Sequence, residues 1–89
     1  MDFGKFCDIA DDFRHGINFK CGSFVKIEKD VIVGDNVTIE NFVLLRSGTR
    51  IGNNVKIEEY AMLLSGSSIG NGTKIGTYTK VGKSAFIGD

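Results

Sequence analysis

His15 is the only histidine in the chain, and its imidazole is the side chain best suited to act as a general base near neutral pH. Such a base could take a proton from a hydroxyl or an amine. The alternative interpretation is a buried or capping histidine with a purely structural role. The large neighbours Phe13 and Phe19 leave the local register open, so both interpretations stand.

Two acidic side chains, Glu40 and Glu58, occupy equivalent places in successive copies of a sequence repeat. If they met, each carboxylate would raise the pKa of the other, which is one way to prepare a proton-transfer site. The alternative is a pair of solvated side chains that point apart. Glu28 and Arg46 are equivalent in the same way, which suggests a surface ion pair of little energetic value.

Lysines recur at the same spacing. Lys20, Lys56 and Lys74 form one series that Thr38 interrupts, and Lys80 follows shortly after. Together these ammonium groups could bind phosphates, or they could form an ordinary solvated face.

The two cysteines, Cys7 and Cys21, are not spaced like the ligands of a metal site, so we expect no bound metal. Both fall at positions where we expect small apolar side chains in the interior. A disulfide between them is the alternative interpretation.

The elements that would position these side chains follow from a repeat with a period of six. Every sixth residue from Phe3 to Ile87 is apolar, apart from His15, and a second series four positions later is small or β-branched from Val25 onward. Six residues advance a helix by about 600°, so successive members of a series would point in directions roughly 240° apart and would not share one face. In a strand, residues two apart share a face, so each hexad predicts a short strand with two inward residues and a corner.

Three hexads make one longer copy, visible in VGDNVTIENFVLLRSGTR (33–50) and IGNNVKIEEYAMLLSGSS (51–68). A triangular coil is the simplest closed shape with three strands and three corners per copy. Stacked at about 4.8 Å, some five coils would form an all-β parallel prism. The polar pairs Asp35–Asn36 and Asn53–Asn54 then form corners, since these residues tolerate left-handed backbone conformations.

The hexads VGDNVT, IGNNVK, IGNGTK and IGTYTK resemble the hexapeptide-repeat family. The resemblance covers nearly the whole chain and implies a left-handed parallel β-helix. It also implies CoA-dependent acyl or acetyl transfer to sugars or amines, with acetyl-CoA or another acyl-CoA as donor and His15 as the catalytic base. No tightly bound cofactor is expected. Gamma-class carbonic anhydrases share the resemblance, but their metal needs three histidines and this chain has one.

The resemblance implies equally well a non-catalytic structural or oligomerisation module, because family members commonly form trimers with their prisms side by side. In the triangular coil, Phe24, Phe42, Tyr60 and Tyr78 stack at one corner. An outward apolar stripe beside them predicts an oligomer interface, most simply in a homotrimer. Its residues are Phe42, Leu44, Tyr60, Met62, Leu64 and Tyr78. The alternative is ring stacking that only makes the corner rigid.

Composition narrows the possible partners and compartment. The formal net charge of +0 and the lack of a basic patch argue against a nucleic-acid partner. No apolar run approaches the length of a membrane span, and the acidic N-terminus does not resemble a signal peptide. We therefore expect a cytoplasmic protein with no membrane partner.

We interpret residues 1–89 as a single β-helix domain. The chain stops at Ile87-Gly88-Asp89, in the middle of a hexad. Since solenoids need covered ends, we expect either a domain truncated at its C-terminus or an end that a partner covers.

Overall fold

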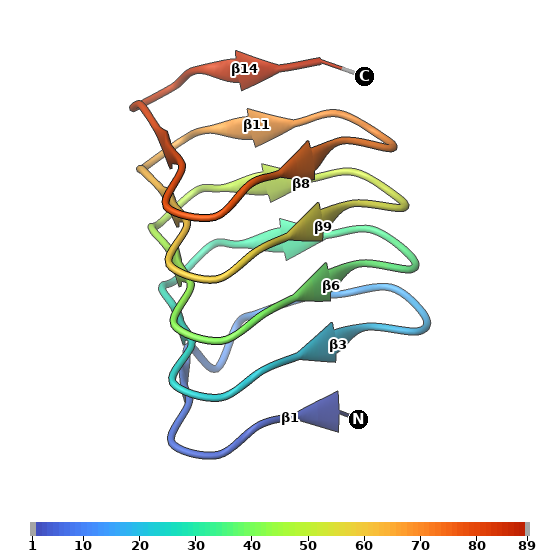
Figure 1. The fold of residues 1–89 in the computed structure, drawn as a ribbon, viewed down its shortest axis with the longest axis vertical. Helices are drawn as coiled ribbons and strands as arrows, with labels where there is room; N and C mark the ends of the chain where they lie inside the picture. The colour runs from blue at the N-terminus through green and yellow to red at the C-terminus, as the bar shows by residue number, and fades with distance from the viewer. Residues whose placement is uncertain (1, 89) are drawn as a thin grey trace.

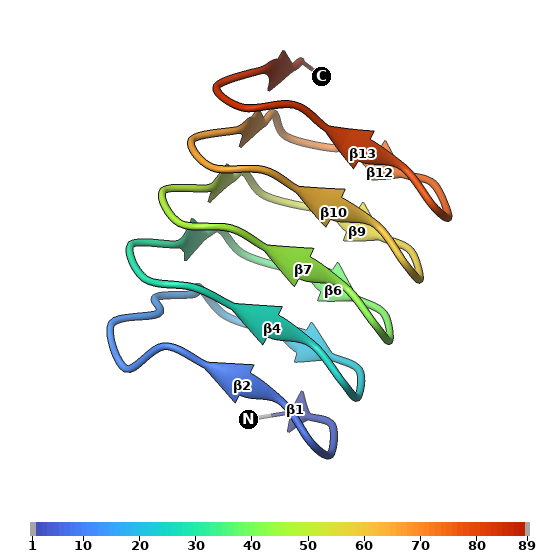
Figure 2. The same cartoon turned by 90° about the vertical axis from the view of Figure 1, so that its left-hand side faces the viewer.

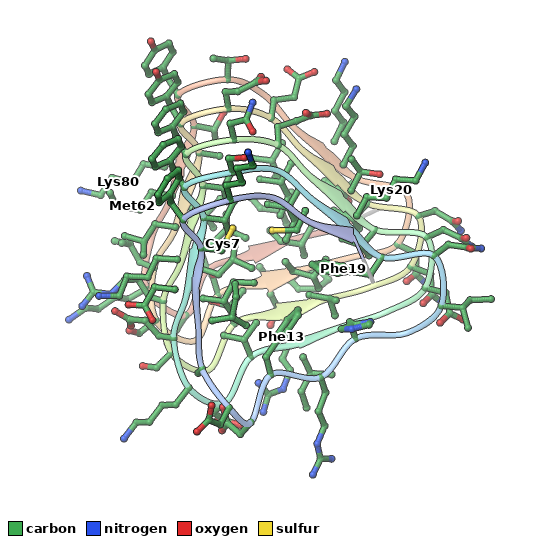
Figure 3. All side chains as sticks on the ribbon, turned by 90° about the horizontal axis from the view of Figure 1, so that it is seen from below. Cys7, Phe13, Phe19, Lys20, Met62 and Lys80 are labelled. Atoms are coloured by element: carbon green, nitrogen blue, oxygen red, sulfur yellow. The ribbon has the colours of Figure 1, made fainter. Side chains whose placement is uncertain are left out.

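The computed structural model describes residues 2–88 and shows a parallel β-solenoid with a triangular cross-section (Figures 1 and 3). The predicted all-β fold is confirmed, and the described residues contain no helix of any kind. In particular, this part of the chain has no helix long and apolar enough to cross a membrane.

Each side of the triangle is a parallel sheet of two-residue strands. Sheet A consists of β1 (Asp2–Phe3), β3 (Lys20–Cys21), β6 (Thr38–Ile39), β9 (Lys56–Ile57) and β12 (Lys74–Ile75). Sheet B consists of β2 (Asp8–Ile9), β4 (Lys26–Ile27), β7 (Leu44–Leu45), β10 (Met62–Leu63) and β13 (Lys80–Val81). Sheet C consists of β5 (Ile32–Val33), β8 (Arg50–Ile51), β11 (Ser68–Ile69) and β14 (Phe86–Ile87), and Arg14 joins it through a bridge to Ile32.

The chain makes four complete turns between β1 and β12, and β13 and β14 continue into a fifth, close to the five coils predicted. Following the chain upward through Figures 1 and 2 gives a left-handed coil. Each strand pairs with its equivalent one coil away throughout the described chain, from Asp2 with Lys20 to Ser68 with Phe86. Because Arg14 pairs with Ile32 in the same way, the first coil keeps the register of the others.

The two inward series form the core. Ile39, Ile57 and Ile75 stack one above another in sheet A and are almost completely buried. The second series is equally buried from Phe19 to Ser67 and includes two polar members, Thr49 and Ser67. Burial of these columns supplies the main favourable free energy of the fold, at about 25 cal/mol per Å² of apolar surface.

Each corner of the triangle contains a residue with left-handed backbone geometry. Asn36 (φ 58°), Phe42 (φ 61°) and Gly48 (φ 77°) occupy the three corners of one coil. For a residue other than glycine this geometry costs about 1–2 kcal/mol, so each such corner needs a compensating interaction.

At the corner between sheets C and A the compensation comes from side-chain amides. Asn53 Oδ1 accepts a hydrogen bond from the Asp35 N–H at 2.7 Å, and Asn71 Oδ1 accepts one from the Asn53 N–H at 2.7 Å. A Cβ atom on Gly34 would come within 2.1 Å of Asn53 Oδ1. The glycine at the second position of these hexads therefore makes room for the amide of the coil above.

We expect Ile57→Asp to destabilise the protein by several kcal/mol, because it places an unpaired carboxylate between Ile39 and Ile75. Lys56→Ser on the same strand is the matched control, since Lys56 points outward and half its side chain is exposed. Thermal unfolding followed by circular dichroism measures both. A soluble Ile57→Asp variant that melts with the wild type would contradict the stacked core.

Candidate functional site

His15 follows Arg14 directly, and the Arg14–Ile32 bridge therefore places it in the inward column, as the repeat predicts. Its ring is half-buried and stacks on Phe19, with ring centroids 4.8 Å apart and planes inclined by 21°. Its Nδ1 lies 2.8 Å from the carbonyl oxygen of Gly16, which can only accept, so Nδ1 carries a proton in this geometry. The imidazole is held as part of an aromatic packing cluster.

Phe13 completes this cluster at the lower end of the prism. Its ring lies 5.3 Å from that of Phe19 and 5.5 Å from that of His15. Seen from below, Phe13 and Phe19 point into the triangle (Figure 3). The large side chains that left the register open in the sequence therefore fill the first coil without displacing it.

The cysteines are free thiols in the interior of the first two coils. Cys7 Sγ donates to the carbonyl oxygen of Gly22 at 3.2 Å. Burial raises the pKa of the Cys21 thiol to about 12, and the neighbouring Cys7 adds to the shift. A thiol in this state is a poor nucleophile. Within residues 2–88, no group of His, Cys, Asp and Glu side chains is placed to hold a metal ion.

The two glutamates of sheet A do not form a carboxylate pair. Glu40 lies 3.8 Å from Lys56 Nζ, and Glu58 lies 3.3 Å from Lys74 Nζ. The hydrogen bond from Lys74 lowers the pKa of Glu58, with a smaller contribution from Thr77 and against some desolvation. This direction is opposite to that needed for a general acid at neutral pH.

The predicted pair of Glu28 and Arg46 is present on sheet B, with Arg46 Nε 3.0 Å from the carboxylate. Desolvation acts to raise the pKa of Glu28, but hydrogen bonds from Arg46 and from the Ser47 N–H lower it overall. Both side chains are partly exposed, so the pair contributes little to stability.

The lysine series is split between two faces. Lys20, Thr38, Lys56 and Lys74 are successive outward residues of sheet A, as the spacing predicts. Lys80 belongs to sheet B, where it pairs with Met62, so its grouping with the other three was wrong. Lys20 and Lys80 project from different sides of the triangle (Figure 3). Lys80 stands one hexad after Lys74, and each hexad moves the chain to the next side.

The corner between sheets A and B carries a ladder of five stacked aromatic rings. Successive centroids are 4.8–5.2 Å apart and the planes differ by at most 16°. The ladder comprises Phe6, Phe24, Phe42, Tyr60 and Tyr78. Phe6 was missed in the sequence, although it stands exactly one copy of the repeat before Phe24.

All five ring-bearing residues have left-handed backbone geometry, with φ between 59° and 64°. Each stacked pair contributes about 0.5–1.5 kcal/mol beyond area burial, which is comparable with the cost of about 1–2 kcal/mol of that geometry. Stacking therefore offsets the strain of the corner and holds each ring in one orientation.

The predicted apolar stripe lies along this corner and the adjoining face of sheet B. Tyr78 is 73% exposed, Tyr60 47% and Phe42 45%. Leu44 and Met62 are direct cross-strand partners and half-buried, as is Leu64. We call this set the apolar surface; it comprises Phe42, Leu44, Tyr60, Met62, Leu64 and Tyr78. Met62 points outward next to the aromatic corner (Figure 3).

Comparison with known protein families gives one finding that agrees with this geometry. Residues 48–83 match a family described as bacterial transferase hexapeptide (six repeats). This segment spans two complete coils and includes β8 to β13. No curated protein matches the chain significantly.

We expect Cys21 to resist thiol reagents in the folded protein, because only the thiolate attacks and its raised pKa leaves almost none at about pH 8. The Cys7→Ser variant isolates Cys21, and a chromogenic disulfide reagent measures its labelling rate in buffer and in denaturant. Labelling should become fast only when the chain unfolds. Equal rates under both conditions would contradict the buried placement.

Proposed function

Because this chain belongs to the hexapeptide-repeat family of left-handed β-helices, we propose that it acts as a non-catalytic assembly module whose copies join through the apolar surface. The observation that carries this proposal is the exposure of Phe42, Tyr60 and Tyr78 beside the apolar cross-strand pair Leu44 and Met62. Exposed apolar surface of this kind marks interaction sites more often than chance.

The surroundings of the apolar surface have the layout of an interface. On sheet B the outward column runs from Lys26 through Leu44 and Met62 to Lys80, so the apolar pair has a charged residue at each end. Apolar centres with charged rims are typical of protein interfaces.

Rigidity favours association through this face. Phe42 and Tyr60 stack with planes only 2° apart, and each ring also contacts a further ring of the ladder. Side chains already fixed in one orientation lose little entropy when a partner covers them. Trimers are common in the family, and we propose a homotrimer with the prisms side by side.

We expect the wild-type protein to scatter light as an oligomer, with three times the mass of one chain. Replacing Leu44 and Met62 together with lysine should give a folded monomer, because four like charges would then follow one another along the column from Lys26 to Lys80. The control variant carries lysine at Thr38 and Ser68, the outward positions of sheets A and C. It should remain oligomeric.

A wild-type protein that is monomeric at physiological concentrations would contradict the proposed interface. The aromatic stacking would then serve only to make the corner rigid. An oligomer that survives in the Leu44→Lys, Met62→Lys variant but dissociates in the control would move the interface to another face.

Acyl transfer is the second candidate function, and the match to a bacterial transferase family favours it. In this proposal acetyl-CoA or another acyl-CoA is a transient donor, a sugar or amine is the acceptor, and His15 is the base. The position of His15 speaks for weak activity at best, since its ring is half-buried against Phe13 and Phe19. A general base must come within about 2.6–3.2 Å of the proton it removes, directly or through one water.

We expect isothermal titration with acetyl-CoA to give weak binding, and an acceptor screen to give no turnover that depends on His15. His15→Ala removes both the imidazole and its stacking, whereas His15→Phe removes the imidazole and retains the stacking on Phe19. We therefore expect the Ala variant to lose stability and the Phe variant to retain it. Tight binding with turnover that both variants abolish would establish the transferase instead.

We also propose a cytoplasmic location. Cys7 and Cys21 are free thiols in adjacent coils, a state that a reducing compartment maintains. Fractionation of cells that express the full-length protein would test the location.

A further inference from the structure

A polar hollow lies at the corner between sheets C and A, away from the aromatic corner. It is open to solvent, has a volume of about 250 Å³ and is lined by Asn18, Lys20, Asn36 and Thr38. None of these side chains belongs to the apolar surface, so whatever this hollow does is independent of the proposed assembly.

The hollow exists because Thr38 interrupts the lysine column of sheet A. Lys20 pairs with Thr38 on one side, and Lys56 pairs with it on the other. The short Thr38 side chain leaves a gap beside the longer Lys20, and Thr38 is partly buried there.

Hydrogen-bond donors remain available in this gap. Asn18 Nδ2 donates to Asn36 Oδ1 at 2.9 Å, which leaves the Nδ2 of Asn36 as a donor. Among the side chains that the structure describes (residues 4–88), none accepts a hydrogen bond from Asn36 Nδ2, the Thr38 hydroxyl or Lys20 Nζ. Three donors on three neighbouring side chains therefore have no acceptor within this described range.

Charge at the hollow is set by Lys20. Higher in the same column, Lys56 pairs with Glu40 and Lys74 pairs with Glu58. In each pair, the glutamate directly follows the sheet A strand of the coil below the lysine. The position equivalent to these glutamates for Lys20 is occupied by Gly4, so the same pairing cannot form there. Lys20 therefore lacks the glutamate partner that neutralises Lys56 and Lys74.

Two nearby acidic residues, Asp35 and Glu40, have other partners. Asp35 Oδ1 accepts from the Ile17 N–H at 2.9 Å and lies over Gly16, on the sheet C side of the corner. Glu40 is next to Lys56.

We propose that this hollow binds a small oxyanion, such as the phosphate of a phosphate monoester or a carboxylate. Lys20 supplies the charge, while the Asn36 amide and the Thr38 hydroxyl donate hydrogen bonds to the oxygens. Charge-assisted hydrogen bonds of this kind are stronger than neutral ones, and a lysine serves as a point charge for phosphate.

Inorganic phosphate is the first probe, titrated into ¹⁵N-labelled wild-type protein at constant ionic strength and followed by amide chemical shifts. We expect saturable shifts confined to Asn18, Lys20, Asn36 and Thr38 and their neighbours. Lys20→Ala and Thr38→Val should each weaken binding about tenfold or more, the second without a change of charge. Lys74→Ala is the matched control and should bind phosphate like the wild type, because Lys74 is on the same face but outside the hollow.

A parallel titration with acetate distinguishes the two sources of the anion: the tighter ligand identifies phosphate or carboxylate as the natural group. Shifts that spread equally over Lys56 and Lys74, or that Lys20→Ala leaves unchanged, would overturn the proposal. So would the absence of saturable shifts with both anions. Light scattering of the same variants keeps this result separate from the assembly, because neither Lys20→Ala nor Thr38→Val touches the apolar surface.

Discussion

Hydrogen bonds between successive coils stack equivalent residues of the described chain one above another, and the other features of the molecule depend on this register. Thr38 N–H donates to Val55 O at 3.0 Å, and Lys56 N–H donates to Thr73 O at 3.2 Å, in the same pattern one coil higher. A side chain therefore meets its own counterpart above and below. Whatever type the repeat places at a position becomes a column, whether aliphatic, aromatic, amide or charged.

The corners show how one constraint produces different solutions. All three need left-handed backbone geometry, which is unfavourable for most residues. At one corner asparagine tolerates the geometry, and the neighbouring amides bond to the backbone of the coil below. At the second corner aromatic rings stack on one another. At the third, Gly48 and Gly66 adopt the geometry freely because they have no Cβ.

The same columns determine where function can arise. Charges on sheet A neutralise one another because each upper lysine reaches the glutamate of the coil below. The apolar surface and the polar hollow both lie where the residue type of an outward column changes. Leu44 and Met62 replace lysine in the sheet B column, and Thr38 replaces lysine in the sheet A column. The imidazole of His15, in contrast, is half-buried against the rings of Phe13 and Phe19.

The period of six and its threefold multiple were enough to predict the triangular coil, both inward series, the aromatic corner and the outward position of Leu44 and Met62, since a rigid repeat converts spacing directly into position. The same spacing also predicts that Phe6 belongs to the ladder and Lys80 to sheet B. Phe6 was overlooked, and Lys80 was wrongly grouped with the lysines of sheet A. Handedness followed only from the family resemblance, because the repeat fits a coil of either hand.

Other features were decided by the tertiary structure. The first coil kept its register because Arg14 pairs with Ile32, although Phe13 and Phe19 are larger than their later counterparts. The partners of long side chains depend on their positions in space: Glu58 forms an ion pair with Lys74 and no carboxylate pair with Glu40. The polar hollow also depends on the direction of the Asn18 amide. A flexible side chain has several staggered conformations of similar energy, and only its three-dimensional neighbours select among them.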